Sequence, residues 1–126
     1  MAAFMKPYEE QTYAALRIVC GLLFFCHGLQ KLFGYPPSSF EPPPLLLYVA
    51  GPIELVGGAL IAIGLFTRWA GFVCSGMMAV AYWRAHGLNH LLPLANGGEL
   101  AVLYCFVFLF IAARGPGLWS VDASRA

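Results

Sequence analysis

Three side chains that can carry a charge or move a proton lie inside apolar stretches of this chain. His27 and Lys31 stand four residues apart in the stretch 17–34, RIVCGLLFFCHGLQKLFG, so they share one face of a helix. Glu54 is the only charged residue in the next apolar stretch, 45–66. A lysine can stabilise a negative charge that develops on a ligand, and a histidine or glutamate can transfer a proton. Because ionisable groups in apolar surroundings are costly unless they face a partner or a polar cavity, these three are the first candidates for a functional site.

Further polar residues are expected at the same depth. Two acids and two cations would make the set neutral, namely Glu54, Glu99, Lys31 and Arg84. The predicted catalytic groups are Glu54, Lys31, His27 and Glu99, and the residues expected to bind a cofactor are Phe24, Tyr82, Arg84, His86 and Asn96. A structural alternative stays open, in which these ion pairs only fix the register of the helices. Glu99 would then simply complement the dipole at the start of a helix.

A pair of histidines raises the question of a metal. His86 and His90 have the spacing of two ligands on one helix, and His27 could complete a haem or copper site. Gly87 and Pro93 argue against a continuous helix at this point. We therefore expect no metal and no haem.

The composition indicates a membrane protein. Of the 126 residues, 60% are hydrophobic and 10% are charged, whereas soluble domains average about 45–50% apolar and about 25% charged residues. The length suits one compact domain. Net charge is +1 with no basic tract, which argues against a nucleic-acid partner.

Four helices are expected, over 13–33, 45–66, 69–85 and 99–113, separated by a proline-rich loop, a short turn and a second loop. They predict an all-α fold, an integral membrane four-helix bundle with antiparallel up-down topology. Because the charge-free runs are short, the spans require several arginines to extend towards the lipid head groups: Arg17, Arg68, Arg84 and Arg114. A soluble all-α core is the alternative.

The basic residues predict the orientation in the membrane. Five lie at the termini and in the turn after residue 66 (Lys6, Arg17, Arg68, Arg114 and Arg125), and two lie on the other side (Lys31 and Arg84). Loops rich in Lys and Arg stay in the cytoplasm, so both termini are predicted to be cytoplasmic and the polar cavity to lie in the outer half of the inner membrane. Aromatic residues near the polar groups favour a small polar or quinone-like ligand.

The ordered set of these motifs resembles the DoxX family of small four-helix bacterial membrane proteins. The resemblance rests on RIVCGLLFFCHGLQKLFG, ELVGGALIAIGLFTRWAG, NGGELAVLYC and GPGLWSVD, and it covers nearly the whole chain. It implies a redox role at the quinone pool, because members of the family are associated with thiosulfate:quinone oxidoreductase. This chain would then be a subunit of a quinone-linked oxidoreductase that oxidises thiosulfate or other small sulfur and thiol compounds, with a second protein subunit or a homo-oligomer as its partner. The alternatives are a non-catalytic membrane scaffold or assembly partner, and a small-solute transporter.

Overall fold

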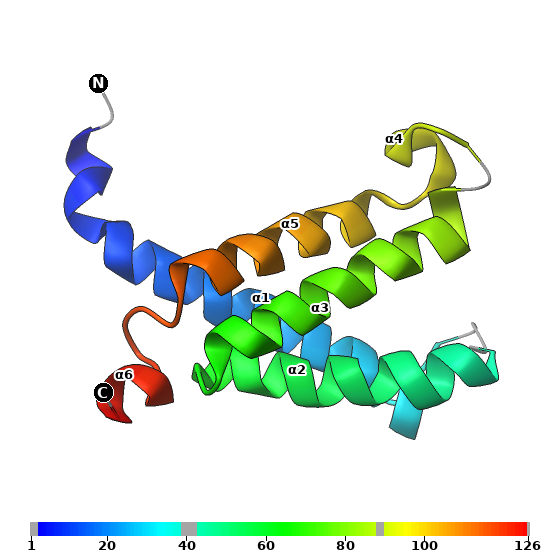
Figure 1. Ribbon diagram of the computed structural model, residues 1–126, viewed down its shortest axis with the longest axis horizontal. Coiled ribbons are helices and arrows are strands. Elements are labelled where there is room, and N and C mark those ends of the chain that lie inside the picture. The colour runs from blue at the N-terminus through cyan, green and yellow to red at the C-terminus, as the bar shows by residue number, and fades with distance from the viewer. Residues whose placement is uncertain (1–2, 39–42, 88–89, 126) are drawn as a thin grey trace.

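The computed structural model describes residues 3–38, 43–87 and 90–125, and within these ranges the chain is all-α and without β-strands. The all-α prediction is therefore confirmed. The elements in chain order are η1 (Ala3–Tyr8), α1 (Glu9–Phe33), η2 (Leu46–Ala50), α2 (Gly51–Ile63), α3 (Thr67–Tyr82), η3 (Trp83–Gly87), α4 (Pro93–Asn96), α5 (Glu99–Arg114) and α6 (Val121–Arg125) (Figure 1). The segment η1 is a 3₁₀ helix, and η2 and η3 are π-helical turns.

The long helices α1, α2, α3 and α5 pack against one another, mainly as α1 with α2, α3 with α5, and α2 with α3. Lys31 near the end of α1 contacts Glu54 near the start of α2, so these two helices are antiparallel. In Figure 1 both termini lie at the end of the molecule where α2 turns into α3. The opposite end holds the loop after α1 and the segment that contains α4 (Figure 1). We call these the terminal end and the loop end.

Glycines let α1 and α2 pack backbone against backbone. A Cβ atom added at Gly21 would lie 2.5 Å from the backbone nitrogen of Ala62, and one at Gly58 would lie 2.5 Å from the nitrogen of Phe25. Any larger residue at either position would push the helices apart. Close backbone approach at small residues is the usual way in which helices associate in a membrane.

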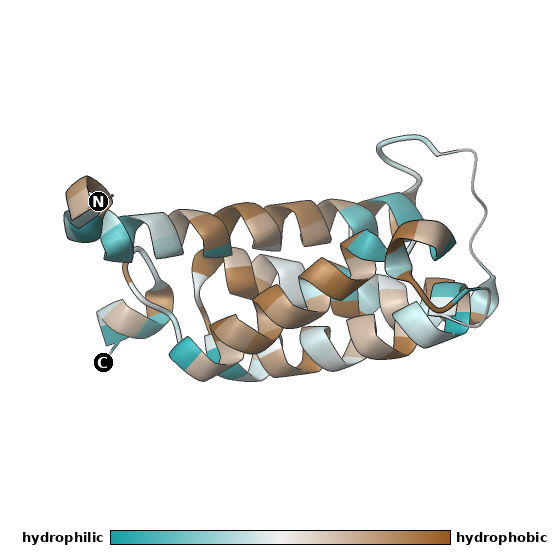
Figure 2. Ribbon diagram, turned by 90° about the horizontal axis from the view of Figure 1, so that it is seen from above, coloured by the Kyte–Doolittle hydropathy of each residue, from teal (hydrophilic) through white to brown (hydrophobic). Residues whose placement is uncertain are grey.

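Large apolar side chains also cover the outside of the helices. The exposed ones include Leu22, Leu23, Phe72, Val80, Leu103 and Phe106. Figure 2 shows apolar colouring along most of the length of the helices and more polar colouring towards the two ends. Lipid acyl chains would cover such a surface, whereas water would not.

The helix lengths divide the four expected spans into two groups. Ala3–Phe33, with 31 residues, and Leu46–Ile63, with 18, are long and apolar enough to cross a membrane by length and composition. Helix α3, with 16 residues, continues directly into the 5 residues of η3. Helix α5 has 16 residues, about 24 Å at 1.5 Å per residue, against a hydrocarbon core of about 30 Å. Four spans therefore stay a prediction.

The predicted helix ends differ from the structure mainly around the turn between the second and third helices. Helix α2 ends at Ile63 and not at residue 66, because Gly64 takes a left-handed conformation with φ of 73° and caps the helix. Helix α3 starts at Thr67 and not at residue 69. At the N-terminus, α1 begins at Glu9, so the helix is longer than the predicted range 13–33.

Candidate functional site

Lys31 and Glu54 form a buried ion pair at the loop end of the bundle. The Lys31 ammonium donates to both carboxylate oxygens of Glu54, at 2.7 Å to Oε2 and 3.0 Å to Oε1. The Glu54 side chain is 4% exposed and that of Lys31 is 19% exposed. A lysine ammonium has three donors, and within the described residues two of them go to Glu54 and the third has no partner. The pair is neutral overall and still has one strong donor for a ligand.

This pair borders a cavity of about 480 Å³ between the helices. Its walls are mostly apolar and come from α1, η2, α2, α3, η3, α5 and Gly97 just before α5. The lining residues are Phe24, His27, Lys31, Leu46, Ala50, Glu54, Met77, Met78, Ala81, Ala85, His86, Gly97, Leu100, Ala101 and Tyr104. The volume falls within the range of about 300–1,000 Å³ that is typical of small-molecule sites.

Aromatic rings form one wall of the cavity. The ring centroid of Tyr104 lies 5.4 Å from that of Phe108 and 5.3 Å from that of Phe24. His27 meets Tyr104 edge-on at 6.0 Å, and its imidazole makes no hydrogen bond to the part of the chain that the structure describes. The imidazole of His27 is therefore free to exchange a proton with a ligand.

A hydrogen-bond network holds His86 at the edge of the cavity. The His86 Nδ1 atom lies 3.0 Å from the backbone carbonyl oxygen of Asn96, which can only accept, so Nδ1 carries the proton and Nε2 is left as an acceptor. The Asn96 side-chain amide donates to the Tyr82 hydroxyl at 2.9 Å, and its oxygen accepts from the backbone N–H of Gly98 at 2.8 Å. Tyr82 and Asn96 thus support the site without lining the cavity itself.

Two of the predicted site residues do not belong to this cluster. Arg84 and Glu99 are exposed, neither lines the cavity, and within the described residues neither forms an ion pair. The structure therefore does not bring Arg84 and Glu99 into one neutral set of charges with Lys31 and Glu54. Arg84 lies in η3 two residues before His86, and residues two apart do not share a helix face. Glu99 is the first residue of α5, where the helix dipole favours an acid.

Tyr104 is the cavity residue that the sequence analysis missed. It is the only tyrosine of α5 and lies four residues before Phe108, so the two share the buried face of that helix. A polar tip on the buried face of an apolar helix is a signal that the sequence does contain. Met77 and Met78 were missed as well, and nothing in the sequence distinguishes them from ordinary core residues.

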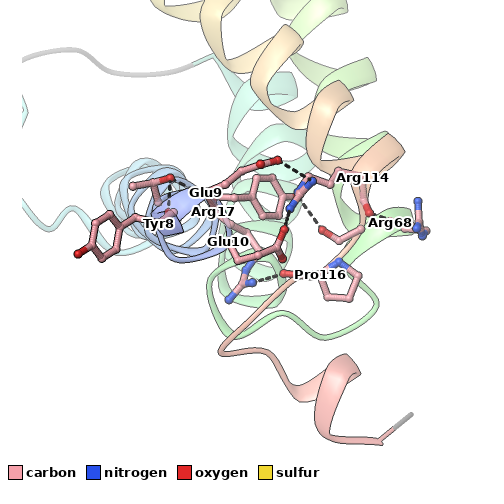
Figure 3. Close-up of polar contacts among 10 residues, drawn as sticks. Tyr8, Glu9, Glu10, Arg17, Arg68, Arg114 and Pro116 are labelled. Atoms are coloured by element: carbon pink, nitrogen blue, oxygen red, sulfur yellow. Dashed lines mark hydrogen bonds and ion pairs between the residues drawn. The ribbon is translucent and has the colours of Figure 1, made fainter. Parts of the chain in front are cut away.

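A second polar cluster lies at the terminal end, and it corrects another prediction. Arg17 is completely buried and does not extend to the lipid head groups. Its guanidinium donates to the carbonyl oxygens of Ile61 at 3.1 Å, Leu118 at 2.9 Å and Trp119 at 2.7 Å. It also donates to the carbonyl oxygen of Pro116 (Figure 3). The prediction failed because the C-terminal segment folds back over the start of α1 and offers the arginine these acceptors.

Asp122 attaches the same C-terminal segment to the start of α3. Its carboxylate accepts from the backbone N–H of Phe66 at 3.0 Å, and from the backbone N–H and the hydroxyl of Thr67 at 2.9 Å each. Burial raises the pKa of Asp122, but these hydrogen bonds from Thr67 and Phe66 outweigh it and leave the pKa below its usual value. The carboxylate acts as the N-cap of a helix that is distant in sequence.

Two more arginines complete the terminal end. Arg68 donates to the carbonyls of Ala112, Ala113 and Arg114 at the end of α5. Arg114 pairs with Glu10 and lies over the ring of Tyr13, with 4.5 Å from its Cζ to the ring centroid (Figure 3). Arginines at the end of a helix satisfy its free carbonyl groups and its dipole, so this end of the molecule is held by structural contacts.

Apolar helices with apolar outer faces, and an internal cavity next to a buried ion pair, define a small helical membrane protein with a ligand-sized pocket. Residues 12–87 match the model of the DoxX family, and this is more than half of the chain. The chain belongs to the DoxX family.

Proteins from several bacteria are similar to this chain over nearly their whole length. It is 41% identical to an "Uncharacterized protein" of Haemophilus influenzae, over 94% of this chain and 93% of the relative. It is also 41% identical to "Putative oxidoreductase CatD" of Bacillus subtilis, over 93% of this chain and 88% of the relative. It is 27% identical to "Inner membrane protein YqjF" of Escherichia coli, over 94% and 95%. No solved structure matches. The family and these relatives support a location in a bacterial membrane.

Proposed function

We propose that this protein transfers electrons from a small sulfur or thiol compound, such as thiosulfate, to a quinone that binds in the cavity at the loop end. The observation that carries the proposal is the mostly apolar cavity of about 480 Å³ next to the buried Lys31–Glu54 pair. The Bacillus subtilis relative is named "Putative oxidoreductase CatD", which supports the reaction class. Thiosulfate as the electron donor and the quinone pool as the electron acceptor are taken from the resemblance to the DoxX family.

The chemistry of the cavity favours the quinone as its ligand over the sulfur donor. Lys31 and Glu54 cancel in charge, so nothing in the pair offsets the desolvation of a dianion such as thiosulfate. A quinone is neutral and mostly apolar, and its carbonyl oxygen can accept the remaining N–H of Lys31. The sulfur compound would then react at another surface, or on a second subunit.

The residues around the cavity fit the reduction of a quinone. Two thiols or two thiosulfate ions that join through a new S–S bond release two electrons, and a quinone takes two electrons and two protons to become a quinol. Lys31 would stabilise the negative charge that develops on the quinone oxygen. His27 is the better proton donor than Glu54, because both oxygens of Glu54 already accept from Lys31.

The topology is part of the proposal. With four spans and both termini in the cytoplasm, the cavity at the loop end would lie in the outer half of the membrane. A quinone could then enter sideways from the lipid. Cysteine labelling from outside intact cells, at Ser38 and at Ser124, tests this arrangement, since only the first would react.

A non-catalytic scaffold is the second candidate, and one observation favours it. Lys31 satisfies both oxygens of Glu54, as expected of an ion pair that orders helices α1 and α2 and does nothing else. The two candidate functions predict different effects of a His27 variant, because only a redox function needs a proton donor at this position. A scaffold would not need the proton of that imidazole.

The experiment uses the purified protein in lipid nanodiscs with a short-chain ubiquinone, and with thiosulfate or dithiothreitol as the electron donor. We expect wild type to bind the quinone and form quinol. His27→Phe should lower the rate at least about 100-fold, the low end for the loss of a general acid, with little change in quinone affinity. Cys26→Ala, a change at the exposed neighbouring residue, is the matched control and should behave as wild type. Wild-type protein that neither binds nor reduces the quinone would contradict the redox proposal.

A further inference from the structure

We propose that the hydroxyl of Tyr104 donates a hydrogen bond to a carbonyl oxygen of the molecule bound in the cavity. This inference rests on the proposed function, because it assumes that the cavity takes a ligand. Tyr104 lines the cavity and is only 6% exposed. Within the described residues its hydroxyl has no hydrogen-bond partner, although the hydroxyl of a buried tyrosine usually has one.

The other two buried tyrosines of the described chain show the usual situation. Tyr13 donates to the carbonyl oxygen of Gly115 at 2.6 Å. The Tyr82 hydroxyl accepts from the side-chain amide of Asn96 at 2.9 Å. Tyr104 differs from both in having its hydroxyl unpaired in a cavity wall.

The ring of Tyr104 is held in place by its neighbours. It stacks on Phe108 with an interplanar angle of 11° and packs against Phe24 at 52°. His27 covers it edge-on at 89°. Because these contacts fix the ring, the hydroxyl cannot turn to find a partner elsewhere in the protein, and the partner has to come from the cavity.

The donors in the cavity define the chemistry of that partner. A phenol donates well, and the remaining N–H of Lys31 is a second donor. Two hydrogen-bond donors in a mostly apolar cavity fit a ligand that carries a hydrogen-bond acceptor on an apolar body. A ring ketone or a quinone fits this description, whereas a hydrocarbon does not.

The test compares Tyr104→Phe with wild type in detergent micelles, using three probes whose binding is measured by calorimetry. The probes are 1,4-naphthoquinone with two carbonyl groups, acetophenone with one, and naphthalene with none. We expect the variant to bind both carbonyl probes about threefold to tenfold more weakly, as for the loss of one hydrogen bond, and to bind naphthalene unchanged. Equal binding of the carbonyl probes by the variant and wild type would overturn the inference, and so would the failure of both probes to bind wild type.

Thermal unfolding provides the control for a purely structural role. Tyr104→Phe should unfold at the wild-type temperature or above, because its hydroxyl has no protein partner to lose. Tyr13→Phe loses a real hydrogen bond and should unfold at a lower temperature. If Tyr104→Phe unfolds as early as Tyr13→Phe, the hydroxyl serves the fold and the inference is wrong. If acetophenone binding depends on Tyr104 but naphthoquinone does not bind, the inference stands and the quinone proposal fails.

Discussion

Removing one member of the Lys31–Glu54 pair should cost much more stability than removing both. Lys31→Met leaves the carboxylate of Glu54, whose side chain is 4% exposed, with no cation beside it. Breaking a buried pair from one side costs about 3–5 kcal/mol. Glu54→Met leaves an ammonium that is 19% exposed towards the cavity, so we expect a smaller loss of about 1–3 kcal/mol.

The double variant, Lys31→Met with Glu54→Met, should be nearly as stable as wild type. Replacing both members of a buried pair by apolar residues of similar volume is often neutral or stabilising. Since the single losses sum to at least about 4 kcal/mol, the interaction energy between the two sites should be about 4 kcal/mol or more, above the range of about 0.5–3 kcal/mol that is usual for residues in contact. The double variant should nonetheless lose binding of 1,4-naphthoquinone, because the lysine donor is gone.

The assay is reversible unfolding in mixed micelles with increasing detergent denaturant, followed by circular dichroism for all four proteins of the cycle. A pair of exposed residues elsewhere, Arg84 and Glu99, supplies the control cycle, and its interaction energy should be close to zero. If the costs of the Lys31 and Glu54 variants simply add, the two groups are not coupled. The role given to the ion pair would then be refuted.

Two further predictions concern the terminal end and the packing of the helices. Because its pKa is lowered in the folded protein, Asp122 stabilises the docked C-terminal segment fully above the unfolded value of about 3.9, and this contribution disappears as the pH falls below it. The protection factor of the Thr67 amide, which is its intrinsic exchange rate divided by the observed rate, should therefore fall at acid pH, and Asp122→Asn should flatten that dependence. Gly58→Ala should cost about 1–3 kcal/mol by forcing α1 and α2 apart, whereas Gly76→Ala, with no atom within 4 Å of the added carbon, should gain up to about 1 kcal/mol. Unfolding midpoints that shift equally for both glycine variants would contradict this view of the packing.

The part of the site formed by His27, Lys31 and Glu54 followed from the sequence. His27 and Lys31 share a helix face by their spacing, and the loop between the first two helices makes these antiparallel, which brings Glu54 to the same height. Periodicity is dependable at these positions because the helix is regular around them. The structure places all three on one cavity.

The positions of Arg84 and Arg17 did not follow, because they depend on local backbone geometry and on parts of the chain that are distant in sequence. Arg84 lies in a π-helical turn, and no residue pattern in the sequence predicts that turn. Arg17 was predicted to reach the lipid head groups because it is a basic residue near a helix end. Its real partners are carbonyl groups about a hundred residues further along the chain, and a reading of local sequence cannot find them.

The two ends of the bundle differ in their contacts and in the regularity of their backbone. At the terminal end, Arg17 and Asp122 join the C-terminal segment to three helices through hydrogen bonds, so that end is held tightly. At the loop end, the π-helical turns η2 and η3 both border the cavity, and π-helical turns in long helices are frequent at functional sites. A ligand that enters there would meet a less regular backbone while the far end keeps the four long helices in register. The ion pair lies at the loop end, where it joins α1 to α2 and also borders the cavity, so its removal should affect both stability and ligand binding.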